Sequence, residues 1–586
     1  MELSHLKELP TSREMIDVFK GYNHNLRIGD GEFYDMTNLS ADNYPILSPR
    51  HKRGIYATPN NPQGIMVAKD SLCYVDGGDF VINEYDRVSI NGGLNDEPKT
   101  LISMGAYVII MPDKKYINTE NYSDNGSIEA EVTTSGTVSF TLCKVDGAEY
   151  GNVPQSATAP SAPENMDLWI DTSETPHQLK QYSTTTDMWS TIATTYIKIS
   201  ADGIGVPFSV NDGVTISGVE SEALSDLNAS MIVWAKGDNY IVVTGILDEV
   251  TSQDKPITVS RKMPNMDFII ESENRLWGCR YGVALNDEVV NEIYACKLGD
   301  FKNWNCFQGI STDSYAASVG TDGQFTGAIT HLGYPLFFKE NYVHKVYGNY
   351  PANYQIQTTA CRGVQKGCSR SLAIVNEVLY YKARSGVCAY DGSLPVEISS
   401  ALGEVAYHNA VAGSLGNKYY ISMSDNNEKW HLFVYDTLKG MWHREDDTQA
   451  DVFCNCRGDL YYIDHGDDYG QKPIKTVRGS GIIDTTPIKW QAVTGIIGTD
   501  SPDKKYISRM DVRMSLAVGT RVSFYAEYDS SGEWEHLFTT PPVAKLGTFA
   551  VPIKPKRCDH MRLKLIGNGD AKIYSICKTI EQGSDV

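Results

Sequence analysis

Residues 417–436 read NKYYISMSDNNEKWHLFVYD, and this stretch decides the fold class. Two runs rich in Tyr, Ile, Phe and Val flank a short polar segment of Asp, Asn and Glu. Aromatic and β-branched runs of this length, separated by turn-forming residues, are typical of two strands joined by a tight connection. The stretch therefore predicts a β-hairpin.

The same pattern recurs along the chain, each time as a turn, a strand that contains Leu, Val or Tyr with aromatic neighbours, a second turn and a second strand. Its copies are centred on Leu72, Val108, Leu276, Leu336, Leu379, Tyr419 and Leu460. Four of the six intervals lie near 40 residues, the length of one four-stranded propeller blade. A four-stranded sheet that is apolar on both faces cannot bury them alone, whereas radial stacking covers each face with a neighbour. We therefore predict an all-β protein with a β-propeller of about six or seven blades.

Two further parts interrupt and follow the repeat. Between Val108 and Leu276 the interval is too long for one blade, and the composition shifts to Ser, Thr, Ala and Pro, which predicts an inserted small β-module or two. After about residue 482 a different alternating pattern predicts a C-terminal β-sandwich. The expected domains are an N-terminal segment with the first blades (1–121), the insertion (122–251), the remaining blades (252–481) and the sandwich (482–586).

The N-terminal region carries the best helical signal in the chain. Thr11 and Glu14 form a capping-box pattern before Met15, Val18 and Phe19, which predicts two or three helical turns up to Lys20. The turn-rich segment that follows should cross the propeller surface or supply its closing strand.

Charged clusters in the sequence have two interpretations each. The cations Arg50, Lys52 and Arg53 could contact a partner's acids, and the acidic groups of 445–447 and of Asp464, Asp467 and Asp468 could hold a cation. In a chain of this charge we expect all of them to be solvated loops, since the acidic groups lack the spacing of a calcium loop.

Composition excludes several classes of protein. The formal charge is −21, which argues against a binder of duplex DNA, because phosphate affinity comes mainly from Lys and Arg. The N-terminus lacks an apolar signal core and the apolar runs are only of strand length, so no membrane anchor is expected. The scattered cysteines, mostly within apolar runs, suggest folding in a reducing cytoplasm.

The sequence contains no recognisable active site. Nucleophile, zinc-protease, Walker and dinucleotide motifs in a suitable context are missing, and no arginine cluster or carboxylate pair of a propeller glycosidase can be named. We therefore predict no catalytic residues, no metal, no cofactor and no enzymatic activity.

One group of aromatic residues in the insertion could bind a ligand. Trp169, Tyr182 and Trp189 could stack on a sugar ring, because aromatic faces complement the apolar face of a pyranose. A β-module of this size also needs two or three aromatics for its own core, and we favour that interpretation.

Several segments resemble the structural proteins of bacteriophage tail modules. They are Met36-Thr-Asn-Leu-Ser-Ala-Asp-Asn-Tyr-Pro-Ile-Leu-Ser-Pro-Arg50 near the start, Asp167-Leu-Trp-Ile-Asp-Thr-Ser173 in the insertion, and Tyr506–Met514, Asp529–Trp534, Pro555–His560 and Ile573–Ile580 at the end. Among phage proteins, a propeller of this length resembles the tail-nozzle or packaged-DNA stabilisation family.

That resemblance implies a hexameric ring in the virion tail, assembled in the bacterial host cytoplasm. Its partners would be the portal, the adaptor or other tail proteins, with packaged DNA passing through the lumen without sequence-specific binding. A negatively charged lumen would repel the DNA phosphates and let the DNA pass through without adhering. The predicted function is thus a non-enzymatic ring that continues the DNA exit channel and retains packaged DNA. The alternative is a receptor-binding or glycan-binding tail adhesin, and a third possibility is a propeller glycosidase.

Overall fold

The computed structural model is an all-β protein, as the sequence predicts. It describes residues 11–174, 176–246, 251–283, 288–466, 470–479, 481–499, 503–542, 544–554 and 556–582. Helical structure in these residues is confined to four short 3₁₀ segments: η1 (Glu222–Leu227), η2 (Pro351–Asn353), η3 (Ser369–Ser371) and η4 (Ser400–Leu402). No helix in these ranges is long and apolar enough to cross a membrane.

The helix predicted from Thr11 to Lys20 is wrong. Thr11–Ile16 forms strand β1, which pairs antiparallel with β54 (Ala571–Gln582). The capping-box pattern favours a helix only by local interactions, and a long partner strand from the other end of the chain outweighs them.

Seven sheets share one plan, in which four strands lie side by side. Six are simple antiparallel meanders of consecutive strands. The first three consist of β7 (Pro62–Ala68), β8 (Ser71–Asp76), β9 (Asp79–Ile82) and β10 (Asp86–Ser89); β11 (Thr100–Met104), β12 (Tyr107–Met111), β13 (Lys115–Asn118) and β14 (Asn125–Ser127); and β28 (Phe268–Ser272), β29 (Arg275–Val283), β30 (Val289–Ala295) and β31 (Tyr315–Ser318). The next three consist of β32 (Phe325–His331), β33 (Tyr334–Lys339), β34 (Tyr342–Tyr347) and β35 (Gln355–Ala360); β36 (Ala373–Val375), β37 (Val378–Ala383), β38 (Gly386–Tyr390) and β39 (Val396–Glu397); and β40 (Tyr407–Leu415), β41 (Lys418–Asp425), β42 (Trp430–Asp436) and β43 (Met441–Arg444).

The seventh sheet combines both ends of the chain. Strands β44 (Ala450–Cys456), β45 (Asp459–Asp464) and β46 (Ile474–Thr476) are joined by β6 (Gly54–Ala57), which pairs antiparallel with β46. Strand β47 (Ile482–Ile483) lies on the other side of β6. Ile55 is therefore paired on both edges, with Lys475 and with Ile482.

The repeat motifs of the sequence fall on the same position in every sheet. Each of the seven lies on the second strand, which is β8, β12, β29, β33, β37, β41 or β45. These strands are nearly continuous buried runs; in β41, for example, every residue but the last is buried. Such runs, rather than strict alternation, are what a sheet covered on both faces requires.

The sheets cover one another in cyclic order. Contacts join the first strands β7 with β11, β11 with β28, β28 with β32, β36 with β40, β40 with β44, and β44 with β7. Between the sheets of β32 and β36, the rings of Phe338 and Tyr381 lie 5.3 Å apart. The apolar cluster that joins the last sheet to the first contains Ile65 and Tyr74 with Tyr461 and Ile463.

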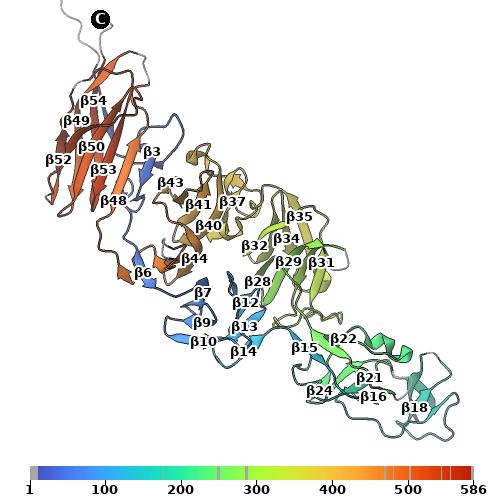
Figure 1. The fold of residues 1–586 in the computed structure, drawn as a ribbon. Helices are drawn as coiled ribbons and strands as arrows, with labels where there is room; N and C mark the ends of the chain where they lie inside the picture. Colours follow the sequence, from blue (N-terminus) through green and yellow to red (C-terminus); the bar gives the residue numbers. More distant parts are fainter. Residues whose placement is uncertain are drawn as a thin grey trace, which may run out of the picture.

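The insertion lies at one end of the elongated molecule, the lower right end in Figure 1. One sheet has the order β15-β27-β22-β23 and the other β24-β25-β21-β16-β26, and their facing sides share one apolar core. The strands are β15 (Ala130–Thr133), β16 (Val138–Cys143), β21 (Tyr196–Ser200), β22 (Gly213–Ser217), β23 (Ser230–Ile232), β24 (Ala235–Gly237), β25 (Tyr240–Thr244), β26 (Thr251–Gln253) and β27 (Thr258–Arg261). A third, small sheet of β17 (Gln155–Ser156), β18 (Leu168–Asp171), β19 (Gln178–Ser183) and β20 (Met188–Thr191) forms the tip.

Two further sheets form the opposite end of the molecule, at the upper left of Figure 1. One has the order β1-β54-β49-β52, and the other contains β3 (Glu32–Thr37), β48 (Lys489–Thr494), β53 (Met561–Asn568), β50 (Arg521–Tyr528) and β51 (Glu535–Thr539). Strands β49 (Lys505–Leu516) and β52 (Lys545–Val551) complete the first of them. The N-terminal strands β1 and β3 thus lie within the sheets built by the C-terminal residues.

A continuous run of strands connects this end to the sheet of β40–β43. Strand β2 (Gly21–Tyr22) pairs antiparallel with β43 and parallel with β3. Strand β3 in turn pairs with β48. The short sheet of β4 (Leu39–Ser40) and β5 (Ser48–Pro49) lies in the same N-terminal segment.

Replacement of Ile55 by Pro tests the role of β6. Pro has no N–H and is not tolerated in a strand paired on both edges. The variant should lose about 1–3 kcal/mol of unfolding free energy in urea titrations, the cost of leaving a ladder acceptor without its donor. Ile55→Val, which keeps the N–H and the branched shape, is the matched control. Equal stability of the two variants would show that the seventh sheet does not depend on β6.

Buried histidines give the fold a defined pH dependence. His344 on β34 is buried, and its two ring nitrogens lie 2.9 Å from Thr358 Oγ1 and 3.0 Å from Thr321 Oγ1. Burial, with a smaller contribution from the charge of Lys339, lowers its pKa to about 4. Burial also lowers the pKa of His443 to about 3.

The unfolded chain takes up these protons near pH 6.5, well before the folded chain does. The stability is therefore fully present above pH 6.5 and falls as the pH drops below it, by up to about 1.4 kcal/mol per pH unit for each histidine. Between pH 6.5 and 5, urea unfolding of His344→Gln should show a slope shallower by about this amount. An unchanged slope would mean that His344 accepts its proton in the folded state.

Candidate functional site

The three candidate aromatic residues lie together on the sheet of β18–β20. Trp169 pairs across the strands with Lys180, and Tyr182 pairs with Trp189. Because Lys180 and Tyr182 are two residues apart on β19, all four side chains project from the same face. We call these four residues the aromatic face.

Exposure differs within the aromatic face. The Trp169 ring is buried, with 5% of the residue exposed, and its Nε1 donates to the carbonyl oxygen and to Oγ of Ser156, at 3.0 and 3.1 Å. Tyr182 and Trp189 are half-buried. The ring of Trp189 lies 5.4 Å from that of Trp169 and 5.4 Å from that of Tyr182. The buried Trp169 ring therefore packs against Trp189, which in turn packs against Tyr182, and the latter two rings remain accessible.

Polar groups surround the rings. Lys180 Nζ lies 2.6 Å from Asp171 Oδ2 and 5.3 Å from the centre of the Trp169 ring. Hydrogen bonds from Lys180 and Ser173 lower the pKa of Asp171 to about 2. The Tyr182 hydroxyl donates to the carboxylate of Asp187. Accessible rings beside hydrogen-bonding groups match a ligand with one apolar and one polar side.

The sequence predicts the aromatic residues of this site but not the contribution of Asp171 and Lys180. The signal was present in the alternation of the strands, because Asp171 lies two residues after Trp169 and Lys180 two residues before Tyr182. Period-two spacing places residues of one strand on one face, but which residues of the neighbouring strands share that face depends on the register. The register came from the structure.

Two of the three acidic residues at 445–447, Glu445 and Asp446, form internal ion pairs, contrary to expectation, whereas Asp447 is exposed as predicted. Arg53 contacts Glu445 Oε2 and Asp446 Oδ2, both at 2.9 Å, and Arg50 contacts Asp446 Oδ2 at 3.2 Å. Glu445 is 4% exposed. The two arginines lower the pKa of Asp446, and its carboxylate in turn helps to raise the pKa of Arg53. These charges form an internal ion-pair network, and the prediction that Arg50 and Arg53 are solvated is wrong.

The remaining acidic candidates do not form a cation site within the described residues. Asp464 pairs with Lys475 at 2.6 Å, whereas Asp467 and Asp468 lie outside the residues that the structure describes. In the described part of the chain, no cluster of three or more His, Cys, Asp and Glu side chains could hold a metal ion.

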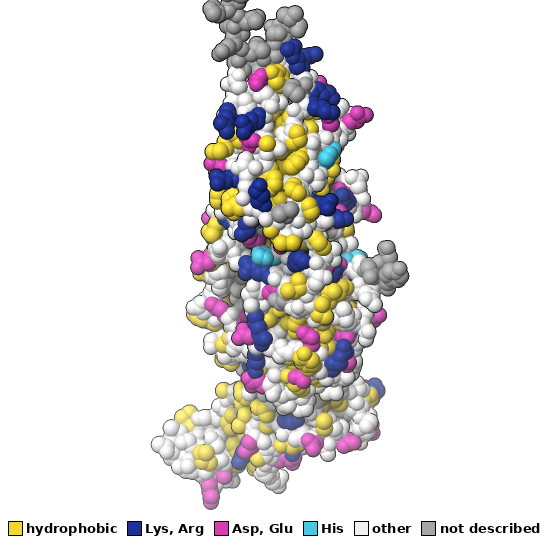
Figure 2. Space-filling model, turned by 90° about the vertical axis from the view of Figure 1, so that its left-hand side faces the viewer, with side chains coloured by type: hydrophobic (Ala, Val, Ile, Leu, Met, Phe, Trp, Pro, Cys, Tyr) yellow, Lys and Arg dark blue, Asp and Glu magenta, His cyan; other side chains and the backbone are white. Residues whose placement is uncertain are grey.

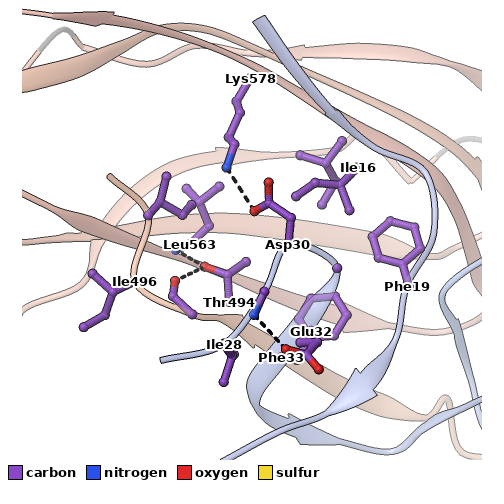
Figure 3. A pocket seen from close by; sticks show the side chains of 15 residues that line it. Ile16, Phe19, Ile28, Asp30, Glu32, Phe33, Thr494, Ile496, Leu563 and Lys578 are labelled. Carbon is purple, nitrogen blue, oxygen red and sulfur yellow. Dashed lines mark hydrogen bonds and ion pairs between the residues drawn. The ribbon is translucent and has the colours of Figure 1, made fainter. Parts of the chain in front are cut away.

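An apolar pocket lies where the N-terminal segment meets the C-terminal sheets (Figure 3). Ile16, Phe19 and Ile28 face Leu563, and Lys578 Nζ lies 3.3 Å from Asp30 Oδ1. Its volume of about 30 Å³ has room for only one or two water molecules. We interpret the pocket as a packing defect beside an ion pair that fastens the N-terminal segment.

Comparisons with known proteins give only distant structural likeness. No family model and no curated protein matches the chain. An exo-β-1,3-galactanase from Phanerochaete chrysosporium is 8% identical over 53% of this chain and 94% of its own, with a TM-score of 0.21. A sialidase from Trypanosoma rangeli is 9% identical over 97% and 96% of the two chains, with a TM-score of 0.21. PorZ, a surface component of the type-IX secretion system of Porphyromonas gingivalis, is 10% identical over 88% and 77%, with a TM-score of 0.25.

Two predictions made from the sequence are corrected by these findings. The similar structures are mostly glycoside hydrolases, and none of those reported is a phage tail nozzle protein. This overturns the predicted function as a non-enzymatic tail ring and the prediction that the chain is not an enzyme. The likeness assigns no residue of this chain to a catalytic site. The resemblance to phage tail proteins, the virion location and the ring partners stay predictions.

Alanine variants of the two tryptophans distinguish a core residue from an accessible residue. Trp169→Ala removes a buried ring and should cost about 3–5 kcal/mol of local stability, whereas Trp189→Ala should cost about 1 kcal/mol. Hydrogen exchange of the amides of residues 155–191, in the full chain, measures both. Trp169→Ala should abolish slow exchange in this segment, and Trp189→Ala should retain it. Equal loss in both variants would show that Trp189 also belongs to the core.

Proposed function

We propose that this chain is a carbohydrate-binding protein, in which the aromatic face contacts a neutral sugar unit of a glycan. The half-buried rings of Tyr182 and Trp189, supported by the buried Trp169, are the observation that carries the proposal. A pyranose has one face of C–H groups, which packs on an aromatic ring, and a rim of hydroxyls, which needs hydrogen-bond partners.

The polar residues of the sheet supply such partners. Asp171 and Lys180 are fixed by their mutual ion pair, and Thr191 Oγ1 donates to Gln178 Oε1 at 2.9 Å. These four lie on the same face as the rings, because Lys180 pairs with both Trp169 and Thr191, and Asp171 pairs with Gln178. Groups already held by neighbours lose little conformational entropy when a ligand binds.

Charge argues for a neutral sugar. Residues 122–251 contain 18 Asp and Glu residues but only four lysines and no arginine. An acidic glycan would be repelled by this field, whereas a neutral one is unaffected by it. Lys180, the cation of the aromatic face, is already neutralised by Asp171.

We further propose that the seven four-stranded sheets form one closed seven-bladed β-propeller that acts as the scaffold. The cyclic contacts of their first strands and the cluster that joins the last sheet to the first support this proposal. The addition of β6 to β44–β46 also supports it, because a strand from one terminus that completes a sheet of the other closes a ring of blades. The aromatic face then lies at the tip of an insertion that extends from the scaffold (Figure 1).

Glycan binding by the full chain tests the function. Isothermal titration with oligosaccharides from a panel of neutral polysaccharides should identify a ligand whose affinity falls at least tenfold in Tyr182→Ala and in Trp189→Ala. A tenfold loss corresponds to about 1.4 kcal/mol, the scale of an aromatic contact.

Met188→Ala provides the matched control, because Met188 is an exposed apolar residue next to Trp189 on the opposite face of β20. Its affinity should equal that of the unchanged chain. Absence of binding to every neutral glycan of the panel, or an equal loss in Met188→Ala, would refute the proposal.

A further inference from the structure

Two adjoining clefts lie between the seventh sheet and the C-terminal sheets, far from the aromatic face. Their volumes are about 750 and 620 Å³, within the range of ligand-binding pockets. Arg50 and Lys52 line both clefts, so the two adjoin and are treated together as one crevice. We call it the basic crevice.

Cations predominate in its lining. Four of them are exposed or half-buried and come from three separate regions of the chain: Lys52, Arg478, Lys489 and Lys572. The fold, and not a run of basic sequence, brings them together. On the face of the molecule drawn in Figure 2, Lys and Arg side chains are more numerous over the upper half, where the C-terminal sheets lie.

The charges of the crevice form two layers. Arg50 and Arg53 in the inner layer are neutralised by Glu445 and Asp446. In the outer layer, Lys52 Nζ donates to the carbonyl oxygen of Thr485 at 3.0 Å. Within the described ranges, none of the four outer cations forms an ion pair with a carboxylate of the chain. Two carboxylates, Asp484 and Asp570, also line the crevice, and the charge of Lys52 adds to the hydrogen bonds from Thr486 that lower the pKa of Asp484. With four cations against two carboxylates, the outer layer carries a net positive charge.

This local charge is opposite to that of the whole protein. The chain carries a formal net charge of −21. Over most of the chain, therefore, the net charge repels anions. Residues 482–586 contain 14 Lys and Arg against 12 Asp and Glu, so the sheets behind the crevice do not cancel its field. A cleft with walls of low dielectric concentrates such a field and raises the local concentration of counter-charged ligands.

We infer that the basic crevice binds a ligand with several oxyanion groups, such as carboxylates, sulfates or phosphates. The Arg478 guanidinium offers paired N–H donors to one oxyanion, and the ammonium groups of Lys52 and Lys572 can bind others. Tyr574, which is half-buried, also lines the crevice and adds a hydroxyl donor. This inference does not depend on the function proposed for the aromatic face.

Titration calorimetry on the full chain at low ionic strength tests the inference with two probes, tripolyphosphate and a trigalacturonate. Binding of either probe supports it, and the preferred probe tells a phosphate source from an acidic glycan. The affinity should fall as salt is added, because the outer cations are exposed to solvent. Binding of neither probe would overturn the inference.

Charge-neutral variants locate the site. Arg478→Gln and Lys572→Gln should each weaken binding by about fivefold to tenfold. Lys504→Gln is the control with the same change in net charge. Lys504 is exposed and directly precedes β49, whose opposite end, at Ser515 and Leu516, lines the crevice.

An equal loss in Lys504→Gln would overturn the inference, because it would mean that only the overall charge matters. So would salt-dependent self-association of the chain without probe binding, since the acidic insertion of a second copy would then fill the crevice. Trp189→Ala should leave probe binding unchanged, which separates this test from that of the aromatic face.

Discussion

The structure depends on the need of seven sheets to cover both of their faces. Strands such as β41 are buried along nearly their whole length, so each sheet exposes two apolar faces until a neighbour covers them. The sheets meet this need in cyclic order, with the cluster of Ile65, Tyr74, Tyr461 and Ile463 between the last and the first. The apolar clusters of the described residues lie between neighbouring sheets. This leaves the ends of the molecule free to carry the insertion and the C-terminal sheets.

The N-terminal segment connects the seven sheets with the C-terminal sheets. Within some fifty residues, β1 and β3 enter the C-terminal sheets, β2 joins the sheet of β40–β43, and β6 completes the seventh sheet. The ion pairs of Arg50 and Arg53 with Glu445 and Asp446 add a buried charge network to the same junction. Removing one partner of such a network leaves a buried charge uncompensated, which is far more costly than losing an exposed ion pair. The junction therefore also fixes the walls of the basic crevice.

Much of the fold could be predicted from local sequence, because the repeat is local. All seven motifs, from Leu72 to Leu460, lie on the second strand of a sheet. The missed features depend on residues far apart in the chain. The helix expected at Thr11–Lys20 became β1 only because β54 supplies a partner. Arg53 and Glu445 are each predicted to be solvated, because the sequence does not show that the fold places them in contact. At the candidate site, the aromatic type of Trp169 and Trp189 was visible in the sequence, but which ring is buried depends on the position of Ser156 and β17.

The net charge of −21 conceals a separation of charge that follows the architecture. Residues 122–251, which hold most of the insertion, contain 18 carboxylates against four lysines, whereas residues 482–586 hold slightly more cations than carboxylates. These parts lie at opposite ends of an elongated molecule (Figure 1), and exposed charges farther apart than a Debye length of about 8 Å are largely screened from each other at physiological salt. Each end therefore presents its own field to a ligand, and neither field is cancelled by the other. An anion drawn to the basic crevice is repelled from the aromatic face, and a neutral sugar has no electrostatic reason to enter the crevice. The two proposed sites are therefore expected to bind their ligands independently of each other.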